Sequence, residues 1–250
     1  MLQQLRHICF DKDGTITDVH VYWSDIINKR AYKLLAYYGL DPGYRKSLAL
    51  AMGIDLNQKK IIPQGPVGYK PRNFVIAAAS RALKALGVTA KTEEIKDVFL
   101  SVDQEMQEKD NYRLKLLKNI PKAFEELRNE GLKISVYTSD RAQNARHIMK
   151  KLNLERYVDI IVGGDDVQKS KPDSEGFKKA CDGVGVPLAH SVYVGDTLED
   201  LRMANSCESL GGVGITTGLC SKEQLLRQSK FVFDNLEDFS KCLSKYFRKL

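Results

Sequence analysis

The stretch that decides the fold is HICFDKDGTITD, residues 7–18, close to the start of the chain. An apolar run from Ile8 to Phe10 reads as a buried β-strand, and it passes directly into Asp11 and Asp13, with Gly14 next. Asp and Gly are common in turns, so a turn alone could explain the pair. Two carboxylates at the end of a buried strand are also what a metal site or an acid–base catalyst requires.

The bulk composition is that of an ordinary globular protein. Of its 250 residues, 43% are hydrophobic and 28% are charged, which is enough to bury a core. The longest apolar runs, such as FVIAAAS from Phe74, are far shorter than a membrane span, and from the first residues, MLQQLRHICF, we expect no secretory signal. The 5 cysteines form no CxxC pair, which argues against a disulfide framework or a zinc site. We therefore expect a cytoplasmic protein without a membrane partner.

The net charge of +7 is concentrated in one segment. Residues 20–115 hold 16 Lys and Arg against 10 Asp and Glu, whereas the rest of the chain holds 23 against 22. Such a segment either attracts an anionic ligand or is a solvated basic face. No basic run interleaved with aromatic residues is present, so we expect no nucleic-acid partner.

After residue 120 the sequence alternates between strand-like and helical segments. The strands are short and apolar on both faces, a pattern typical of a parallel sheet that helices cover on both sides. The prediction is an α/β fold with a doubly wound, mostly parallel, Rossmann-like sheet. Its strands after the first are expected in LKISVYTS (132–139), VDIIVGG (158–164), HSVYVGD (190–196), GGVGITTG (211–218) and KFVFDN (230–235).

The segment 20–115 differs because its pattern is almost entirely helical, with a Pro- and Gly-rich interruption, IIPQGPVGYKP, at 61–71. We predict a catalytic core formed by residues 1–19 and 116–250, with a helical domain, 20–115, inserted after the first strand. An insertion at that place is suited to form a lid over a site at the carboxyl ends of the strands.

Polar residues follow four of the predicted strands at their carboxyl ends, where open α/β sheets bind ligands. Taken singly, each set has a structural explanation as a turn, a helix cap or a solvated charge. Their order along the chain, acid, hydroxyl, base and acid, favours a single shared site. The sets are Asp11 with Asp13, Thr138 with Ser139, Lys169 with Lys171, and Asp196 with Asp200.

The four motifs FDKDGT, VYTS, KSKPD and VGDTLED resemble those of the haloacid dehalogenase (HAD) superfamily. They look most like its phosphatases with an α-helical cap, the branch of phosphoglycolate phosphatase and β-phosphoglucomutase. The similarity spans residues 5–220, with the helical insertion where that branch carries its cap. It implies a Mg²⁺ requirement and a five-stranded core sheet.

The resemblance also implies roles for the motif residues. Asp11 would be the nucleophile that forms an aspartyl-phosphate, and Asp13 the general acid and base. The Mg²⁺ ligands would be the carboxylates of Asp11 and Asp196 and the backbone carbonyl of Asp13, with Asp200 behind them. The hydroxyl of Thr138 and the neighbouring Ser139 amide would bind the phosphoryl group.

The sequence also offers candidates for two positively charged groups, a catalytic lysine and a substrate-binding arginine. In the resembled branch the lysine motif is Lys-Pro-x-Pro-Asp and its first Lys acts in catalysis. When this motif is aligned with KSKPD, its first Lys matches Lys169, and Ser170 stands in place of the first proline. Lys171 is the alternative. In the basic insertion, Arg72 is a candidate for binding an anionic part of the substrate.

The resulting hypothesis is a Mg²⁺-dependent phosphatase that acts on a small phosphorylated metabolite. Asp13 favours hydrolysis because the resembled pumps that preserve their phosphoenzyme have Thr there. Two alternatives remain open: a phosphomutase that uses the same aspartyl-phosphate, and a non-catalytic protein that binds through its basic segment. The sequence indicates no oligomeric state.

Overall fold

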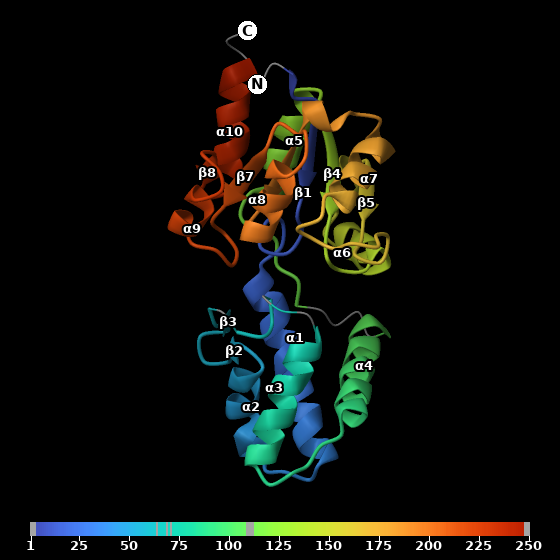
Figure 1. Cartoon of the computed structure of the whole chain (residues 1–250), viewed down its shortest axis with the longest axis vertical. Coiled ribbons are helices and arrows are strands. Elements are labelled where there is room, and N and C mark those ends of the chain that lie inside the picture. Colours follow the sequence, from blue (N-terminus) through green and yellow to red (C-terminus); the bar gives the residue numbers. More distant parts are fainter. Residues whose placement is uncertain (1–3, 64, 69, 71, 109–112, 248–250) are drawn as a thin grey trace. The chain divides into compact units, whose positions relative to one another are not determined.

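The computed structural model describes residues 4–63, 65–68, 70, 72–108 and 113–247 (Figure 1). The chain divides into two units, which we call the core unit (Met1–Asp18 with Leu116–Leu250) and the insert unit (Val19–Lys115). The boundaries expected from the sequence lie within one residue of this division. No helix in the described ranges is both long and apolar enough to cross a lipid bilayer.

A six-stranded sheet forms the centre of the core unit, in the order β5-β4-β1-β6-β7-β8 with every neighbouring pair parallel. This order is that of a doubly wound Rossmann-like sheet, so the predicted fold class is confirmed. The sheet has one strand more than the resemblance implied, because β8 pairs with β7. The strands are β1 (His7–Phe10), β4 (Lys133–Tyr137), β5 (Ile160–Val162), β6 (Ser191–Gly195), β7 (Gly212–Ile215) and β8 (Val232–Phe233).

Helices cover both faces of this sheet, as the two-sided apolar strands require. Alternate residues of β1 point to opposite faces: Phe10 packs on Phe124 of α5 with ring centroids 5.0 Å apart, whereas Cys9 belongs to a buried cluster with Phe177 of α7. The helices of the core unit are α5 (Ile120–Asn129), α6 (Ala142–Lys151), α7 (Glu175–Val184), α8 (Leu198–Asn205), α9 (Lys222–Leu226) and α10 (Leu236–Phe247), with short 3₁₀ turns at Glu155–Tyr157 and Leu188–His190.

The insert unit is helical, as its sequence pattern predicts. Buried residues such as Leu34, Ala79 and Phe99 form its interior. Its elements are α1 (Val19–Tyr37), a 3₁₀ turn (Pro42–Tyr44), α2 (Arg45–Ala51), β2 (Ile54–Asp55), β3 (Lys60–Ile61), α3 (Arg72–Ala85) and α4 (Thr92–Glu108). The antiparallel pair β2 and β3 was not predicted, because two residues are too few to show an alternating pattern.

A buried histidine joins the central strand to its two neighbours. His7 is fully buried at the start of β1, and its ring nitrogens lie 3.0 Å from Ser191 Oγ on β6 and 2.7 Å from Ser135 Oγ on β4. Burial lowers the pKa of His7 to about 4, although the carboxylate of Asp159 acts in the opposite direction. The imidazole is therefore neutral in the folded protein at pH 7.

We expect this histidine to make the fold sensitive to mild acid. Its pKa rises from about 4 in the folded state to the ordinary 6.5 on unfolding, so the unfolded chain binds the extra proton and stability falls as the pH falls from 6.5 towards 4. Between pH 7 and pH 5 the loss from this group is about 2 kcal/mol.

Urea unfolding of the wild type and of His7→Gln at both pH values measures this contribution. The variant should lose about 2 kcal/mol less than the wild type between pH 7 and pH 5, whatever its own stability at pH 7. Equal losses in the two proteins would show that His7 does not carry the effect.

Candidate active site

The register of the sheet brings three of the four predicted motifs to one edge. Phe10, the last residue of β1, pairs with Val136 of β4 on one side and Val194 of β6 on the other. Asp11, Thr138 and Asp196 directly follow these three strands. The amide of Asp11 continues the pairing, because it donates a 2.8 Å hydrogen bond to the carbonyl of Val194. Residues far apart in the sequence thus meet at the carboxyl ends of adjacent parallel strands.

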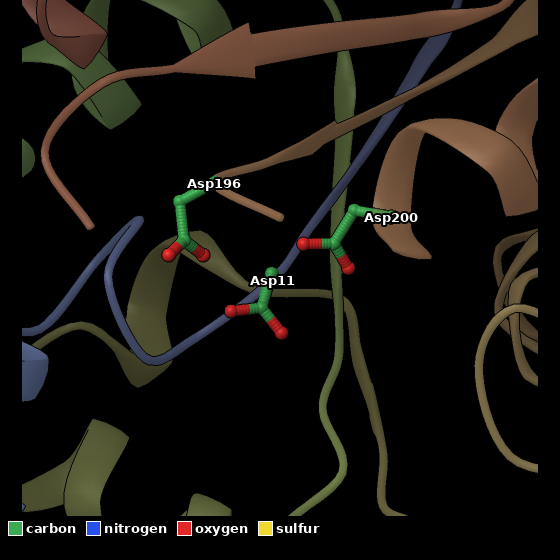
Figure 2. Close-up of side chains that lie close together, drawn as sticks. All are labelled: Asp11, Asp196 and Asp200. Carbon is green, nitrogen blue, oxygen red and sulfur yellow. The ribbon is translucent and has the colours of Figure 1, made fainter. Parts of the chain in front are cut away.

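Three buried carboxylates converge there, from Asp11, Asp196 and Asp200 (Figure 2). Each offers one oxygen, and these oxygens lie within 4.8 Å of one another. The ammonium of Lys171 is the positive charge among them: its Nζ lies 2.5 Å from Asp11 Oδ1 and 2.8 Å from Asp200 Oδ1. Three carboxylates and one ammonium, all ionised, would leave two formal negative charges in a buried space.

Burial opposes that excess charge. It raises the pKa of Asp11 to about 7, although Lys171 lowers it, and the charges of Asp200 and Asp13 raise it further. The pKa of Asp196 rises well above its ordinary value, first through burial and then through the neighbouring Asp11 and Asp200. These carboxyl groups therefore tend to keep a proton unless a further positive charge joins the cluster.

The oxygens of Asp196 and Asp200 differ in their partners. Asp200 Oδ1 accepts from Lys171, and its Oδ2 accepts from the amide and hydroxyl of Thr197 in the capping box that starts α8. Asp196 Oδ2 accepts the amide of Leu219 at 2.8 Å. Asp196 Oδ1 is buried and makes no hydrogen bond within the part of the chain that the structure describes.

A divalent cation fits this arrangement. With all three carboxylates ionised, the formal charge of the cluster is equal and opposite to that of Mg²⁺. The ligand atoms would be the hard oxygens that Mg²⁺ prefers, and the buried Oδ1 of Asp196 has no hydrogen-bond partner among the described residues. Asp11 and Asp196 could bind such an ion directly. Asp200, whose two oxygens already accept hydrogen bonds, is better suited to orient the neighbouring groups.

Three glycines make room for the carboxylates. A Cβ atom at Gly14 or Gly218 would lie less than 3.0 Å from Asp196, and one at Gly195 less than 3.0 Å from Asp200. Gly14 also has a φ of +92°, which side-chain-bearing residues rarely adopt. The backbone can approach the acidic cluster so closely only because these positions lack side chains.

The structure places Lys171 at the cluster and corrects the expectation for Lys169. The side chain of Lys169 is 74% exposed and its Nζ lies 4.0 Å from Asp173, whereas that of Lys171 is only 8% exposed. The backbone amides of Gln168 and Lys169 each donate a 2.9 Å hydrogen bond to Glu175. The backbone at residue 169 is thus held against the start of α7, and the chain turns inward only at residue 171.

The sequence holds one signal that points to this lysine. Lys171, not Lys169, is directly followed by a proline, and Glu175 stands four residues after it. The stretch KPDSE, from Lys171, keeps the Lys-Pro pair that opens Lys-Pro-x-Pro-Asp, which KSKPD lacks, although Ser174 and Glu175 replace the last Pro and Asp.

Two tyrosines, which the sequence analysis did not single out for this role, form a seat for the Lys171 ammonium. The Nζ atom lies 5.1 Å from the ring centroids of both Tyr137 and Tyr193, and the Tyr193 hydroxyl donates a 2.7 Å hydrogen bond to the carbonyl of Tyr137. Burial lowers the pKa of Lys171, but the charges of Asp11 and Asp200 outweigh this and raise it above its ordinary value. The amine stays protonated at neutral pH.

Asp13 does not join the three carboxylates through its side chain. Its Oδ1 accepts hydrogen bonds from Lys12 Nζ at 2.7 Å and from Thr17 Oγ1 at 2.9 Å. The expectation that the backbone carbonyl of Asp13 binds the metal remains a prediction.

The other predicted phosphate-binding residues lie next to this edge of the sheet. Thr138 is buried at the end of β4, and its hydroxyl accepts a 3.1 Å hydrogen bond from the amide of Asp140, which leaves the hydroxyl hydrogen able to donate. Ser139 is exposed beside it. Their binding of a phosphoryl group remains a prediction.

Arg72 belongs to the insert unit, at the start of α3. Its guanidinium lies 2.7 Å from Asp103 Oδ2, while the buried Arg30 lies 2.8 Å from Asp103 Oδ1. The two arginines therefore share one carboxylate and carry one net positive charge. Whether Arg72 binds substrate remains a prediction.

Comparisons with known proteins agree with this geometry. The family model described as haloacid dehalogenase-like hydrolase matches residues 5–207. Phosphoglycolate phosphatase from Salmonella typhi is 23% identical over 258 residues, which cover 97% of this chain and 94% of that protein.

Solved structures share the fold. A predicted phosphoglycolate phosphatase from Haemophilus somnus 129PT has a TM-score of 0.73 at 21% identity, over 96% of this chain and 98% of that chain. A candidate beta-phosphoglucomutase from Thermotoga maritima has a TM-score of 0.70 at 20% identity, over 96% and 99%. The resemblance drawn from the four motifs is confirmed.

The charge of the acidic cluster predicts that Mg²⁺ stabilises the folded protein. An ion that binds only the folded state adds about 2.7 kcal/mol at 100 times its dissociation constant. In thermal unfolding, the melting temperature of the wild type should rise with added Mg²⁺, and that of Asp196→Asn should not, because the variant lacks the carboxylate charge.

Asp234→Asn is the matched control, since this carboxylate is 65% exposed and pairs with Lys222 outside the site. The control should keep the full rise in melting temperature. An equal rise in the Asp196→Asn protein would contradict a metal site at this cluster.

Proposed function

Because the chain belongs to the haloacid dehalogenase-like hydrolase family, we propose that it is a Mg²⁺-dependent phosphatase that hydrolyses small phosphorylated metabolites through an aspartyl-phosphate on Asp11. The observation that carries the proposal is the buried group of Asp11, Asp196, Asp200 and Lys171, with its two excess negative charges. The curated relative named above is a phosphoglycolate phosphatase, which supports a phosphate ester as substrate.

In the first step, a carboxylate oxygen of Asp11 attacks phosphorus in line with the leaving group. The bond between phosphorus and the ester oxygen breaks, its electron pair stays on that oxygen, and the carboxyl of Asp13 gives it a proton. The ammonium of Lys171, 2.5 Å from Asp11 Oδ1, reduces the repulsion between the nucleophile and the phosphoryl oxygens.

A Mg²⁺ ion held by Asp11, Asp196 and the Asp13 carbonyl would add positive charge next to the transferring phosphoryl group. The hydroxyl of Thr138 and the amide of Ser139 would donate hydrogen bonds to the same group. Donors fixed in advance around the equatorial phosphoryl oxygens stabilise the transition state, because the negative charge is spread over those oxygens and the donors need no reorganisation.

In the second step, water attacks the phosphorus of the aspartyl-phosphate. Asp13, now a carboxylate, accepts the proton of that water, and the bond between phosphorus and the Asp11 oxygen breaks. Inorganic phosphate leaves and Asp11 returns to its starting state. A carboxylate at position 13 thus allows one residue to act in both steps.

The insert unit is proposed to act as a cap that admits small substrates and excludes bulk water. Within it, Arg72 is the proposed contact for an anionic part of the substrate. Its side chain is 42% exposed, and Asp103 already orients its guanidinium. Arg30 adds a second positive charge to the same carboxylate.

A panel of phosphorylated metabolites, assayed for phosphate release with Mg²⁺ and with EDTA, tests the function. We expect the wild type to release phosphate with Mg²⁺ only, and Asp11→Asn to be inactive while keeping its circular dichroism spectrum. Isomerisation of a hexose 1-phosphate without phosphate release would favour a mutase. Salt-sensitive nucleic-acid binding without phosphate release would favour a binding protein.

The two lysines of the third motif give a paired test. Lys171→Met removes the ammonium at Asp11 and should lower kcat by about 10²–10³-fold, the usual loss for one such group. Lys169→Met changes an exposed side chain and should leave kcat within about twofold, since the residue touches none of the reacting groups. A larger loss of kcat in Lys169→Met than in Lys171→Met would refute the assignment of Lys171.

A further inference from the structure

We propose that Lys12 is a positioning residue that holds the carboxylate of Asp13 in place for proton transfer; this inference rests on the proposed function. Lys12 stands between Asp11 and Asp13 in the sequence, and its side chain is fully buried. Neither the motif resemblance nor the reaction steps above assign it a role.

The ammonium of Lys12 contacts both oxygens of one acid. Its Nζ lies 2.7 Å from Asp13 Oδ1 and 2.7 Å from Oδ2. Thr17 Oγ1 donates a second hydrogen bond to Oδ1, at 2.9 Å, and the amide of Thr17 is bound by the carbonyl of Lys12 at 2.9 Å. The Asp13 side chain is therefore held by groups that belong to the same short loop.

The burial of the Lys12 ammonium requires an explanation, because removing an ammonium from water is costly and buried lysines are rare unless they are paired. An apolar side chain would fill the space next to the buried strand β1 without that penalty. The side chain that Lys12 binds most closely is that of Asp13, the proposed general acid of the first step and general base of the second. A group that must deliver a proton to one atom gains from having its orientation fixed in advance.

A second contact offers a different explanation. Lys12 Nζ also lies 3.3 Å from Asp140 Oδ2, in the loop that follows Thr138. If Lys12 served only to tie this loop to the first one, its loss would weaken phosphate binding for every substrate alike. The two roles differ in how the effect depends on the leaving group.

The leaving-group dependence follows from the first chemical step. When the ester bond of an alkyl phosphate breaks, the electron pair goes to an alkoxide-like oxygen that takes the proton of Asp13. When p-nitrophenyl phosphate reacts, the p-nitrophenolate leaves without a proton. A misplaced Asp13 therefore slows the alkyl ester much more than the aryl ester.

The test compares kcat/KM for p-nitrophenyl phosphate and for the best alkyl phosphate of the panel, since this constant reports the steps up to loss of the leaving group. For Lys12→Met we expect a loss of about 10²-fold with the alkyl ester and less than about tenfold with the aryl ester. Asp13→Asn should show the same pattern. Lys12→Gln, which keeps a hydrogen-bond donor, should recover part of the alkyl activity.

Asp140→Asn is the matched control, because it removes a second carboxylate that contacts Lys12 and should affect the two esters alike. The inference would be overturned if Lys12→Met lost kcat/KM equally with both esters or did not lose it at all. A loss in Asp140→Asn that was selective for the alkyl ester would overturn it too. If Lys12→Met does not fold, Lys12→Gln replaces it, and the loss of kcat/KM with the alkyl ester is again compared with the loss with the aryl ester. A wild type inactive on every ester would instead refute the proposed function.

Discussion

The core unit brings more negative charge to the end of its central strands than its own residues cancel. Asp11, Asp196 and Asp200 are buried within a few ångströms of one another and share the single ammonium of Lys171. Charges removed from water are stable only when opposite charges or donors replace the lost hydration. The uncompensated negative charge, together with the buried Oδ1 of Asp196, is what suits this edge of the sheet to the cation and the phosphate ester that we propose.

The sheet and its loops are built to hold these charges together. Parallel pairing of β1 with β4 and β6 aligns the strand ends, and the capping box of α8 fixes Asp200 while it closes the end of the helix. Glycine at positions 14, 195 and 218 lets the backbone come close to the carboxylates. The same hydrogen bonds and close contacts that stabilise the local fold also orient the reactive groups.

Two buried lysines divide the acidic groups between them. Lys171, 160 residues from Asp11 in the sequence, compensates the proposed nucleophile, whereas Lys12 binds its sequence neighbour Asp13. The first pairing exists only because the sheet brings the loop before α7 next to β1. The second lies within one tight turn, yet it depends on whether the Lys12 side chain turns inward, which its position between two acids does not reveal.

The local sequence determined the elements of the core unit and the residue types that gather at the candidate site. Apolar runs, helical spacing and Pro or Gly at the ends predicted the strands and helices of the core unit. The order of acidic, hydroxyl and basic residues predicted that the motifs share one edge of the sheet. These features follow from neighbours along the chain, so a sequence records them. The tertiary structure decided three features of the site. Lys171 rather than Lys169 lies at the acidic cluster, two tyrosine rings contact its ammonium, and the Lys12 side chain points inward. Each depends on which way a side chain points from an irregular loop or strand end, and there only packing against distant residues fixes the direction.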